Sequence, residues 1–266
     1  MSVISAMRPT TRRRVSRLST YVVAGILILA VAVFADWDRL GQQFANPAVA
    51  AKMWPEVVTT ALVNTLLYTL AGFAGGVVLA VLLAILKLGG GPLGWLATGY
   101  IELFRGIPML LTIFLFAYGL PIALGVRIPG GGMGAGILGL IVVTSAYTAE
   151  IVRSGIQAVP LGQREAARSL GMSSGTTMFS IVLPQGLRIV IPPMTNEFVM
   201  LLKDSSLLYI AGLQIPQKEL TNFARDALTT NSNATPLIVA AVLYLVITVP
   251  LTWLVGRLEK RLDPKR

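Results

Sequence analysis

The sequence predicts an all-α protein that crosses a membrane several times. Hydrophobic residues make up 55% of the 266 residues and charged residues only 13%, whereas about 25% of the residues of a soluble domain are charged. The apolar residues gather in runs close to the roughly 20 residues that a helix needs to cross about 30 Å of hydrocarbon. A membrane β-barrel would instead show segments of about 10 residues with alternating polarity, and the sequence has none.

Six apolar segments are candidates for spanning helices. They cover about residues 21–35, 57–86, 99–120, 134–152, 187–211 and 236–256. We divide the chain into residues 1–56 (a basic tail, an extra first helix and an outer connector), 57–256 (the main transmembrane domain) and 257–266 (a basic tail). The outer connectors, residues 36–56 and 212–235, are polar and too short to be independent domains.

The first segment has two interpretations. Its arginines, its short apolar run and its small-residue ending at Ala35 are typical of a signal peptide. The alternative is a retained first helix that begins earlier, at Leu18. We favour retention, because the remaining spans already keep the chain in the membrane. Both interpretations give the last five spans the same orientation.

Basic residues predict that orientation. The net charge is +10, but the charges gather at the two ends of the chain rather than in a stripe that binds nucleic acid. With both termini in the cytoplasm, the inner side receives Arg8, Arg12, Arg13, Arg14, Arg17, Lys87, Arg153, Arg164, Arg168, Arg188, Arg257, Lys260, Arg261, Lys265 and Arg266. The outer side receives only Arg39, Lys52, Arg127, Lys218 and Arg225. This bias follows the positive-inside rule and places residues 153–186 in the cytoplasm.

The residue types exclude several classes of chemistry. The chain has no cysteine and no histidine, which rules out disulfides, thiolate metal sites, Ser-His-Asp triads and HExxH metal sites. No GxxxxGK[ST] motif occurs, so we expect no ATP site. Gly134, Gly136 and Gly139 spell GxGxxG without a preceding strand, which argues against dinucleotide binding. Gly72 and Gly76 form GxxxG, a weak indication of a close helix contact.

The cytoplasmic segment EAARSLGMSSGTTMFSIVLP, residues 165–184, predicts two short helices joined at a glycine. Pro160 suits an early helical position, and Gly171 suits the positive φ that follows a helix end. Ser173 or Ser174 can cap a second helix that stops before Pro184. The segment either packs on its own membrane domain or presents this element to a partner.

The spacing of this segment resembles the EAA loop of the membrane permease subunits of bacterial ABC importers. The pattern is carried by Glu165, Ala166, Ala167, Gly171, Ile181, Leu183 and Pro184. In that family the loop forms coupling helices that dock on an ATP-binding subunit. The resemblance therefore implies a partner that holds ATP and magnesium, with no cofactor and no metal in this chain.

Three further segments resemble permeases for polar amino acids. They are YIELFRGIP at residues 100–108, SAYTAEIVR at 145–153, and NEF with LLKDSSL at 196–207, with Ile107 and Ser205 where threonine is usual. The resemblance implies a five-helix permease core plus one extra N-terminal transmembrane helix, in a bacterial inner membrane among lipids. It also implies a second permease subunit, identical or related, and an extracytoplasmic substrate-binding protein.

The fifth segment carries unusual polar groups. Pro192 and Pro193 predict a kink or break, and Glu197 follows near mid-membrane, where a carboxylate is costly and should face inward. We hypothesise a substrate pathway made by Asn196, Glu197, Met200, Lys203 and Asp204, with Ser145, Tyr147 and Thr148 of the fourth span. The acids would receive an ammonium group, and Lys203 or a free backbone N–H a carboxylate. The alternative is a structural polar contact that fixes the kink.

Two acid–base pairs lie three residues apart, Glu102 with Arg105 and Glu150 with Arg153. Their spacing allows pairing on one helix face at the cytoplasmic ends of the third and fourth spans. They are either interfacial anchors or an inner gate. For the whole chain, an importer permease competes with an ion-driven secondary transporter and a scaffold, and the docking element favours the permease.

Overall fold

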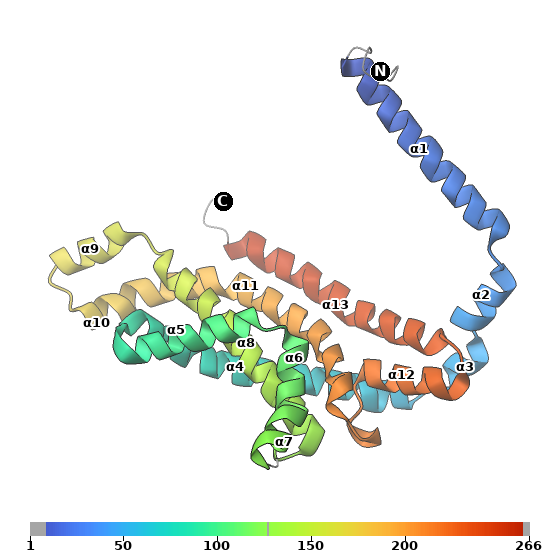
Figure 1. Cartoon of the computed structure of the whole chain (residues 1–266). Coiled ribbons are helices and arrows are strands. Elements are labelled where there is room, and N and C mark those ends of the chain that lie inside the picture. Colours follow the sequence, from blue (N-terminus) through green and yellow to red (C-terminus); the bar gives the residue numbers. More distant parts are fainter. Residues whose placement is uncertain (1–8, 127, 263–266) are drawn as a thin grey trace. The chain divides into compact units, whose positions relative to one another are not determined.

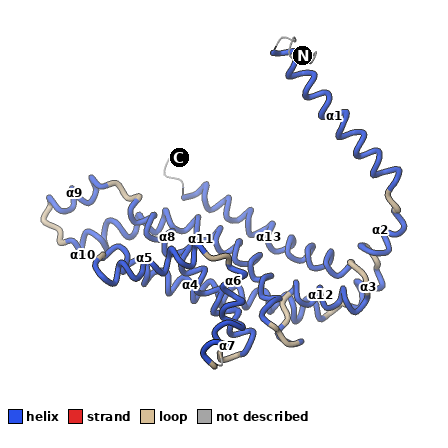
Figure 2. Tube along the Cα trace, in the orientation of Figure 1, coloured by secondary structure: helices blue, strands red, loops and turns tan. Residues whose placement is uncertain are grey.

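The computed structural model describes residues 9–126 and 128–262, and the regular structure of this part of the chain is entirely helical (Figure 2). The chain divides into two units, Met1–Pro47 and Ala48–Arg266. Arg8, Arg127, Lys265 and Arg266, which entered the predicted orientation, lie outside the described residues.

The first unit consists of α1 (Pro9–Phe34) and α2 (Trp37–Phe44). From Leu18 on, the apolar side chains of α1 are exposed, as expected of a helix that faces lipid. Asp36 ends this run and caps α2, since its carboxylate accepts a hydrogen bond of 2.9 Å from the backbone N–H of Arg39.

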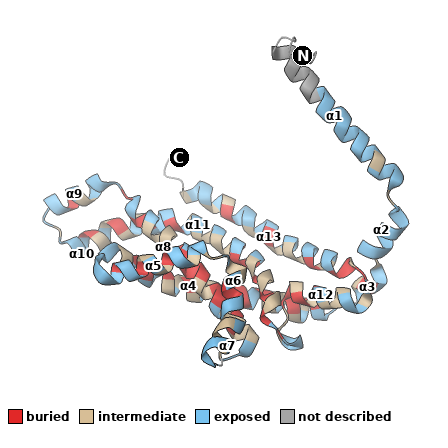
Figure 3. Cartoon of the chain, viewed as in Figure 1, coloured by how far each residue is buried: buried red, intermediate tan, exposed pale blue. Residues whose placement is uncertain are grey.

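The core of the second unit is formed by α4 (Val63–Gly89), α8 (Gly131–Gln157) and α11 (Leu183–Asp204), which lie side by side (Figure 1). Glycines allow α4 to approach α8 closely: a methyl group on Gly76 would lie 2.8 Å from Thr144 Cγ2. The close contact predicted from GxxxG is therefore confirmed. Buried residues concentrate where α4, α6 and α8 meet (Figure 3).

The third predicted span is broken, and this break was not predicted from the sequence. Instead of one segment over residues 99–120, α5 (Gly91–Gly106) and α6 (Met109–Phe114) meet at a bend of 106°. Pro108 has no N–H to continue the helix, and it forces Ile107 into an extended conformation with ψ 131°. A π-helical turn, η3 (Leu115–Gly119), and α7 (Leu120–Leu124) complete this region.

At Pro192 and Pro193, where a kink or break is predicted, α11 is not interrupted and continues through both prolines. The Thr195 hydroxyl donates a hydrogen bond of 2.7 Å to the carbonyl of Ile191 beside them. Packing against α8 holds the helix together, with Val190 placed 2.2 Å from where a Cβ on Gly155 would lie. A 3₁₀-helix, η5 (Ser205–Ala211), follows.

The two segments predicted to be outer connectors contain helices that were not predicted. Residues 36–56 include α3 (Pro47–Lys52), and a π-helical turn, η2 (Val57–Leu62), leads into α4. Residues 212–235 include the 3₁₀-turn η6 (Ile215–Gln217) and α12 (Leu220–Asn231), which packs along the last helix, α13 (Thr235–Leu262). The last helix thus extends beyond residue 256 into the predicted basic tail.

Three described helices are long and apolar enough to cross a membrane alone, namely Val57–Gly89, Gly131–Gln157 and Thr235–Leu262. The number rises to 5 if two bent pairs count as spans, Leu18–Phe34 with Trp37–Lys52 and Gly91–Gly106 with Met109–Leu124. Helix α11, predicted as part of the fifth span, is not among these helices.

Candidate functional site

A cavity of about 410 Å³ lies between the break after α5, the middle of α8 and the second half of α11. The break supplies Arg105 to Met109, α8 supplies Val143 and Tyr147, and α11 supplies Glu197, Met200 and Asp204. The predicted pathway residues Tyr147, Glu197, Met200 and Asp204 are thus brought together. The contribution of the chain break was not predicted, although Pro108 could have indicated it.

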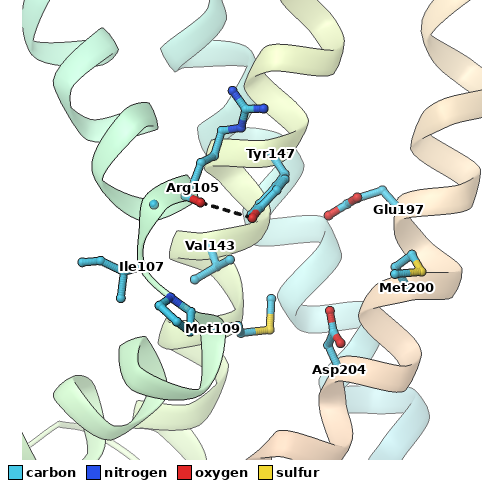
Figure 4. A pocket seen from close by; sticks show the side chains of 10 residues that line it. Arg105, Ile107, Met109, Val143, Tyr147, Glu197, Met200 and Asp204 are labelled. Atoms are coloured by element: carbon cyan, nitrogen blue, oxygen red, sulfur yellow. Dashed lines mark hydrogen bonds between the residues drawn. The ribbon is translucent and has the colours of Figure 1, made fainter.

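Two carboxylates face this cavity. Glu197 and Asp204 are seven residues apart, so they lie two turns apart on nearly the same face of α11. Both are partly buried, and both project toward the space in front of Tyr147 and Met109 (Figure 4). Such a pair of acidic groups can receive a cationic group on a bound molecule.

Arg105 is the only described cation that lines the cavity. Its guanidinium points away from the two acids (Figure 4) and lies 5.6 Å from the centroid of the Tyr147 ring, within the range of a cation–π attraction. The Tyr147 hydroxyl donates a hydrogen bond of 3.4 Å to the carbonyl of Arg105. Tyr147 therefore links α8 to the end of α5 at the cavity wall.

The other predicted pathway residues lie elsewhere. Lys203 lines a separate groove against α13, beside Thr248 and Trp253. Asn196 is exposed and does not line the cavity. Ser145 and Thr148 are fully buried in α8, and the Ser145 hydroxyl lies 2.9 Å from that of Tyr100.

Only one of the two predicted acid–base pairs forms an ion pair within the described residues. Glu150 and Arg153 form the ion pair that their spacing allows, and Lys87 Nζ of α4 joins it at 3.2 Å from Glu150 Oε2. Within the described residues, Glu102 and Arg105 form no ion pair. They also do not lie at the start of a span, since α5 begins at Gly91 and Arg105 is near its far end.

The element at residues 161–184 has much of the predicted local structure. Helix α9 (Leu161–Ser169) is followed, after its C-cap Leu170, by Gly171, whose φ is +82° as expected. The backbone N–H of Met172 bonds to Ala167 O at 3.2 Å and that of Gly171 to Arg168 O at 3.0 Å, the two bonds of a Schellman turn. Pro160 stands one residue earlier than predicted, as the N-cap of α9.

The second short helix does not stop before Pro184, so this prediction was wrong. Ser173 caps α10 (Ser174–Thr177), its hydroxyl accepting a bond from Thr176 N, and a π-helical turn, η4 (Met178–Val182), runs directly into α11. The N–H of Leu183 reaches back five residues to Met178 O. This wider turn accommodates the missing amide hydrogen of Pro184.

The element exposes large apolar side chains while it is tied to its own spans. Leu161, Leu170 and Phe179 are 65%, 84% and 71% exposed, whereas Ala167 is buried against its own chain and Ala166 is exposed. The other members of the spaced pattern, Glu165, Ile181, Leu183 and Pro184, range from partly buried to exposed.

Two side chains fix α9 to the membrane helices. Arg164 Nη2 donates a hydrogen bond to Ile156 O at the end of α8. Gln185 Nε2, at the start of α11, donates to Gln163 Oε1 and, at 2.9 Å, to Ile181 O. Because Ala167 is the only described residue of α9 that is fully buried, these polar links largely determine the helix orientation.

Residues 76–264 match the family model described as "Binding-protein-dependent transport system inner membrane component". The chain belongs to this family. Among its relatives, the probable glutamine ABC transporter permease protein GlnM of Bacillus subtilis (strain 168) is 42% identical over 204 residues, which cover 75% of this chain and 90% of the relative. The arginine transport system permease protein ArgU of Corynebacterium glutamicum is 33% identical over 261 residues, 91% of this chain and 79% of the relative.

A solved structure supports the same family fold. The crystal structure of an amino acid ABC transporter with histidines includes a chain that superposes with a TM-score of 0.74 at 34% identity, covering 80% of this chain and 97% of that one. As a member of this family of inner membrane transport components, the chain is a membrane protein, as predicted. The cavity and the two-helix element both lie within its second unit.

Proposed function

We propose that this chain is the permease subunit of an ATP-driven importer of polar amino acids. One observation carries the proposal: α10, η4 and α11 form one uninterrupted helical stretch from Ser174 to Asp204. Its first turns belong to the exposed two-helix element, and its last turns present Glu197 and Asp204 to the cavity. A movement imposed on the exposed two-helix element is therefore transmitted along one continuous helical segment to Glu197 and Asp204.

The exposed element is the surface that we assign to an ATP-binding partner subunit. Leu161, Leu170 and Phe179 offer apolar contact area, and the alanine at position 166 lets a partner backbone approach closely. The partner would bind ATP with magnesium, and its two states would contact the element differently. That difference in contact free energy is what drives the conformational change.

The cavity is the part of the pathway that we assign to substrate. Glu197 and Asp204 receive the ammonium group of an amino acid, and Arg105 is the cation available to its carboxylate. Lys203 faces α13 instead, so its role in the pathway is secondary to that of Arg105. Much of the remaining lining, including Met109, Val143 and Met200, is apolar and accommodates a small side chain.

The complete importer has further components. A second permease subunit, identical or related, a second ATP-binding subunit and an extracytoplasmic substrate-binding protein complete it, in a bacterial inner membrane with both chain termini in the cytoplasm. The Lys87–Glu150–Arg153 cluster ties α4 to α8 near the end that carries the docking element. We assign it to the inner gate.

Substitutions in the cavity test this function. Glu197→Gln keeps the size of the side chain and removes its charge, so uptake in reconstituted vesicles should fall at least tenfold while the yield of folded complex stays within about twofold. Asn196→Ala, at the neighbouring exposed position, should lower uptake as well. Normal uptake by both variants would remove the assignment of this face of α11 to the pathway.

A further inference from the structure

Lys203 is a charged side chain at membrane depth that its own chain leaves without a counterion. It lines a groove of about 470 Å³ between α11 and α13, beside Leu245, Thr248 and Trp253. Thr248 lies near the middle of α13, which is long and apolar enough to cross a membrane. Lys203 is exposed, and within the described residues it forms no ion pair. Because a lone cation at this depth is costly against hydrocarbon, this side of α11 needs a polar cover.

The side of α11 that carries Lys203 has further exposed residues. Asn196 is seven residues away, so it lies on nearly the same side of the helix, and it is exposed as well. Met200 lies between the two and is 46% exposed. We call residues 196, 200 and 203 the α11 face. Their spacing of four and three residues is the one with which a helix packs against a second helix.

An acidic side chain stands next to the basic end of the α11 face. Lys203 and Asp204 are adjacent in the sequence, so they point about 100° apart around the helix and do not pair with each other. In a dimer with a two-fold axis along the membrane normal, the same residue lies at the same depth in both copies. Lys203 of one copy is then level with Asp204 of the other, and the reverse contact forms at the same time. The α11 face is thus complementary in charge to a second copy of itself.

We propose that the α11 face is the contact surface for a second copy of this chain, with reciprocal ion pairs between Lys203 and Asp204 across the two-fold axis. The groove beside this face receives apolar side chains of that copy, since Leu245, Val249 and Trp253 line it. An acyl chain of a lipid would fill the apolar part of the groove equally well, but it offers no counterion to Lys203. The second permease subunit of the proposed function is therefore an identical chain.

The second copy also completes the charge of the cavity. Asp204 and Glu197 line this cavity, and Arg105 is the only cation that the described part of the chain places there. Lys203 of the second copy brings another cation beside Asp204 and balances the two acids. A cavity of balanced charge suits the zwitterion of a neutral polar amino acid. This consequence for the substrate rests on the proposed function, whereas the contact between copies does not.

Cross-linking in lipid vesicles tests the contact. The chain has no cysteine, so a single introduced cysteine is the only thiol. Lys203→Cys and Asn196→Cys should each give about tenfold more dimer with a short bismaleimide than the control Leu96→Cys. Leu96 is 69% exposed and lies on α5, which packs on α4 and α8. Its thiol is therefore equally free to react but lies outside the α11 face.

Charge reversal tests the ion pairs themselves. Lys203→Glu sets acids against acids across the axis, and Asp204→Lys sets cations against cations. Each variant should raise the dissociation constant of the dimer about tenfold, which corresponds to about 1.4 kcal/mol, as measured by energy transfer between labelled chains at increasing lipid dilution. The double variant exchanges the two charges, restores both reciprocal pairs and should recover most of the affinity. A role of either side chain within one copy predicts no such recovery.

Two results would overturn the proposal. One is cross-linking at Lys203→Cys and Asn196→Cys that is no stronger than at Leu96→Cys, as expected if lipid or a different subunit covers the α11 face. The other is a double charge variant that dimerises no better than the single variants. If a charge variant fails to fold, the cysteine variants decide alone. None of these measurements needs substrate or an ATP-binding partner, so a failure of the proposed transport activity would leave their result unchanged.

Discussion

Gly171→Val should uncouple ATP hydrolysis from uptake by disturbing the turn between α9 and α10. Gly171 has a φ of +82°, and a Cβ built there would meet nothing within 4 Å. The cost of the substitution is therefore conformational rather than steric. An L-residue in the left-handed region loses about 1–2 kcal/mol, and a β-branched side chain is among the least tolerant.

This cost is enough to change the population of the correct turn. A difference of about 1–2 kcal/mol alters a conformational equilibrium roughly 5- to 30-fold. The Schellman bonds from Gly171 N and Met172 N would be lost in the alternative conformation. The exposed side chains on either side of the turn, Leu170 and Phe179, would then no longer share one docking surface.

Gly162→Val provides a matched control, because the same side chain is added at another exposed glycine of the same two-helix element. Gly162 lies inside α9, and a Cβ there also meets nothing within 4 Å, but its φ is not positive. Valine is a slightly better helix former than glycine, by a few tenths of a kcal/mol, so this variant should be neutral or mildly stabilising.

The assay is the number of amino acid molecules taken up per ATP hydrolysed in vesicles that contain the reconstituted complex. Gly171→Val should lower this ratio about fivefold or more, Gly171→Asn should lower it less, since asparagine tolerates the left-handed region, and Gly162→Val should leave it unchanged. An unchanged ratio for Gly171→Val, or an equal loss for Gly162→Val, would refute the role of this turn.

Two further predictions concern the links between helices. Gln163→Ala and Gln185→Ala should each lower uptake per ATP about two- to tenfold, as expected for the loss of one hydrogen bond of about 0.5–1.5 kcal/mol. In a double-mutant cycle, the double variant should be no worse than either single variant. Additive losses would contradict a direct link between the two side chains. Gly76→Ala should lower the free energy of unfolding by about 1–3 kcal/mol through overpacking against α8, whereas Gly99→Ala, which has open space around it, should not, as measured by thermal unfolding in detergent.

Local backbone features were predicted well from the sequence. The positive φ of Gly171 and the cap at Ser173 depend only on neighbouring residues, and both are present. The effect of the prolines was harder to predict. The chain breaks at Pro108, whereas α11, which packs on α8, continues through Pro192 and Pro193.

The cavity was predicted in part. The spacing of Glu197 and Asp204 places them on one face, and the structure brings both to the same cavity. Lys203 is adjacent to Asp204 in sequence and hence about 100° away around the helix, which turns it toward α13. The contribution of residues 105–109 depends on a tertiary contact across 90 or so residues, which no local pattern encodes.

The attachment of residues 216–222 to α4 was not predicted at all. Residues 212–235 are polar on average, which is typical of a loop. This attachment depends on hydrogen bonds with Asn64, Thr65 and Tyr68, which lie far away in the sequence. A buried glutamate such as Glu219 becomes visible only once these elements are assembled.

The most direct test of the proposed function is uptake of labelled polar amino acids by vesicles that contain the chain with its ATP-binding partner, with and without Glu197→Gln. Uptake should require ATP on the side of the membrane where the docking element lies, and it should persist when proton and sodium gradients are dissipated. In the Glu197→Gln variant, uptake should fall at least tenfold. Uptake that continues without ATP and follows an ion gradient would contradict the account.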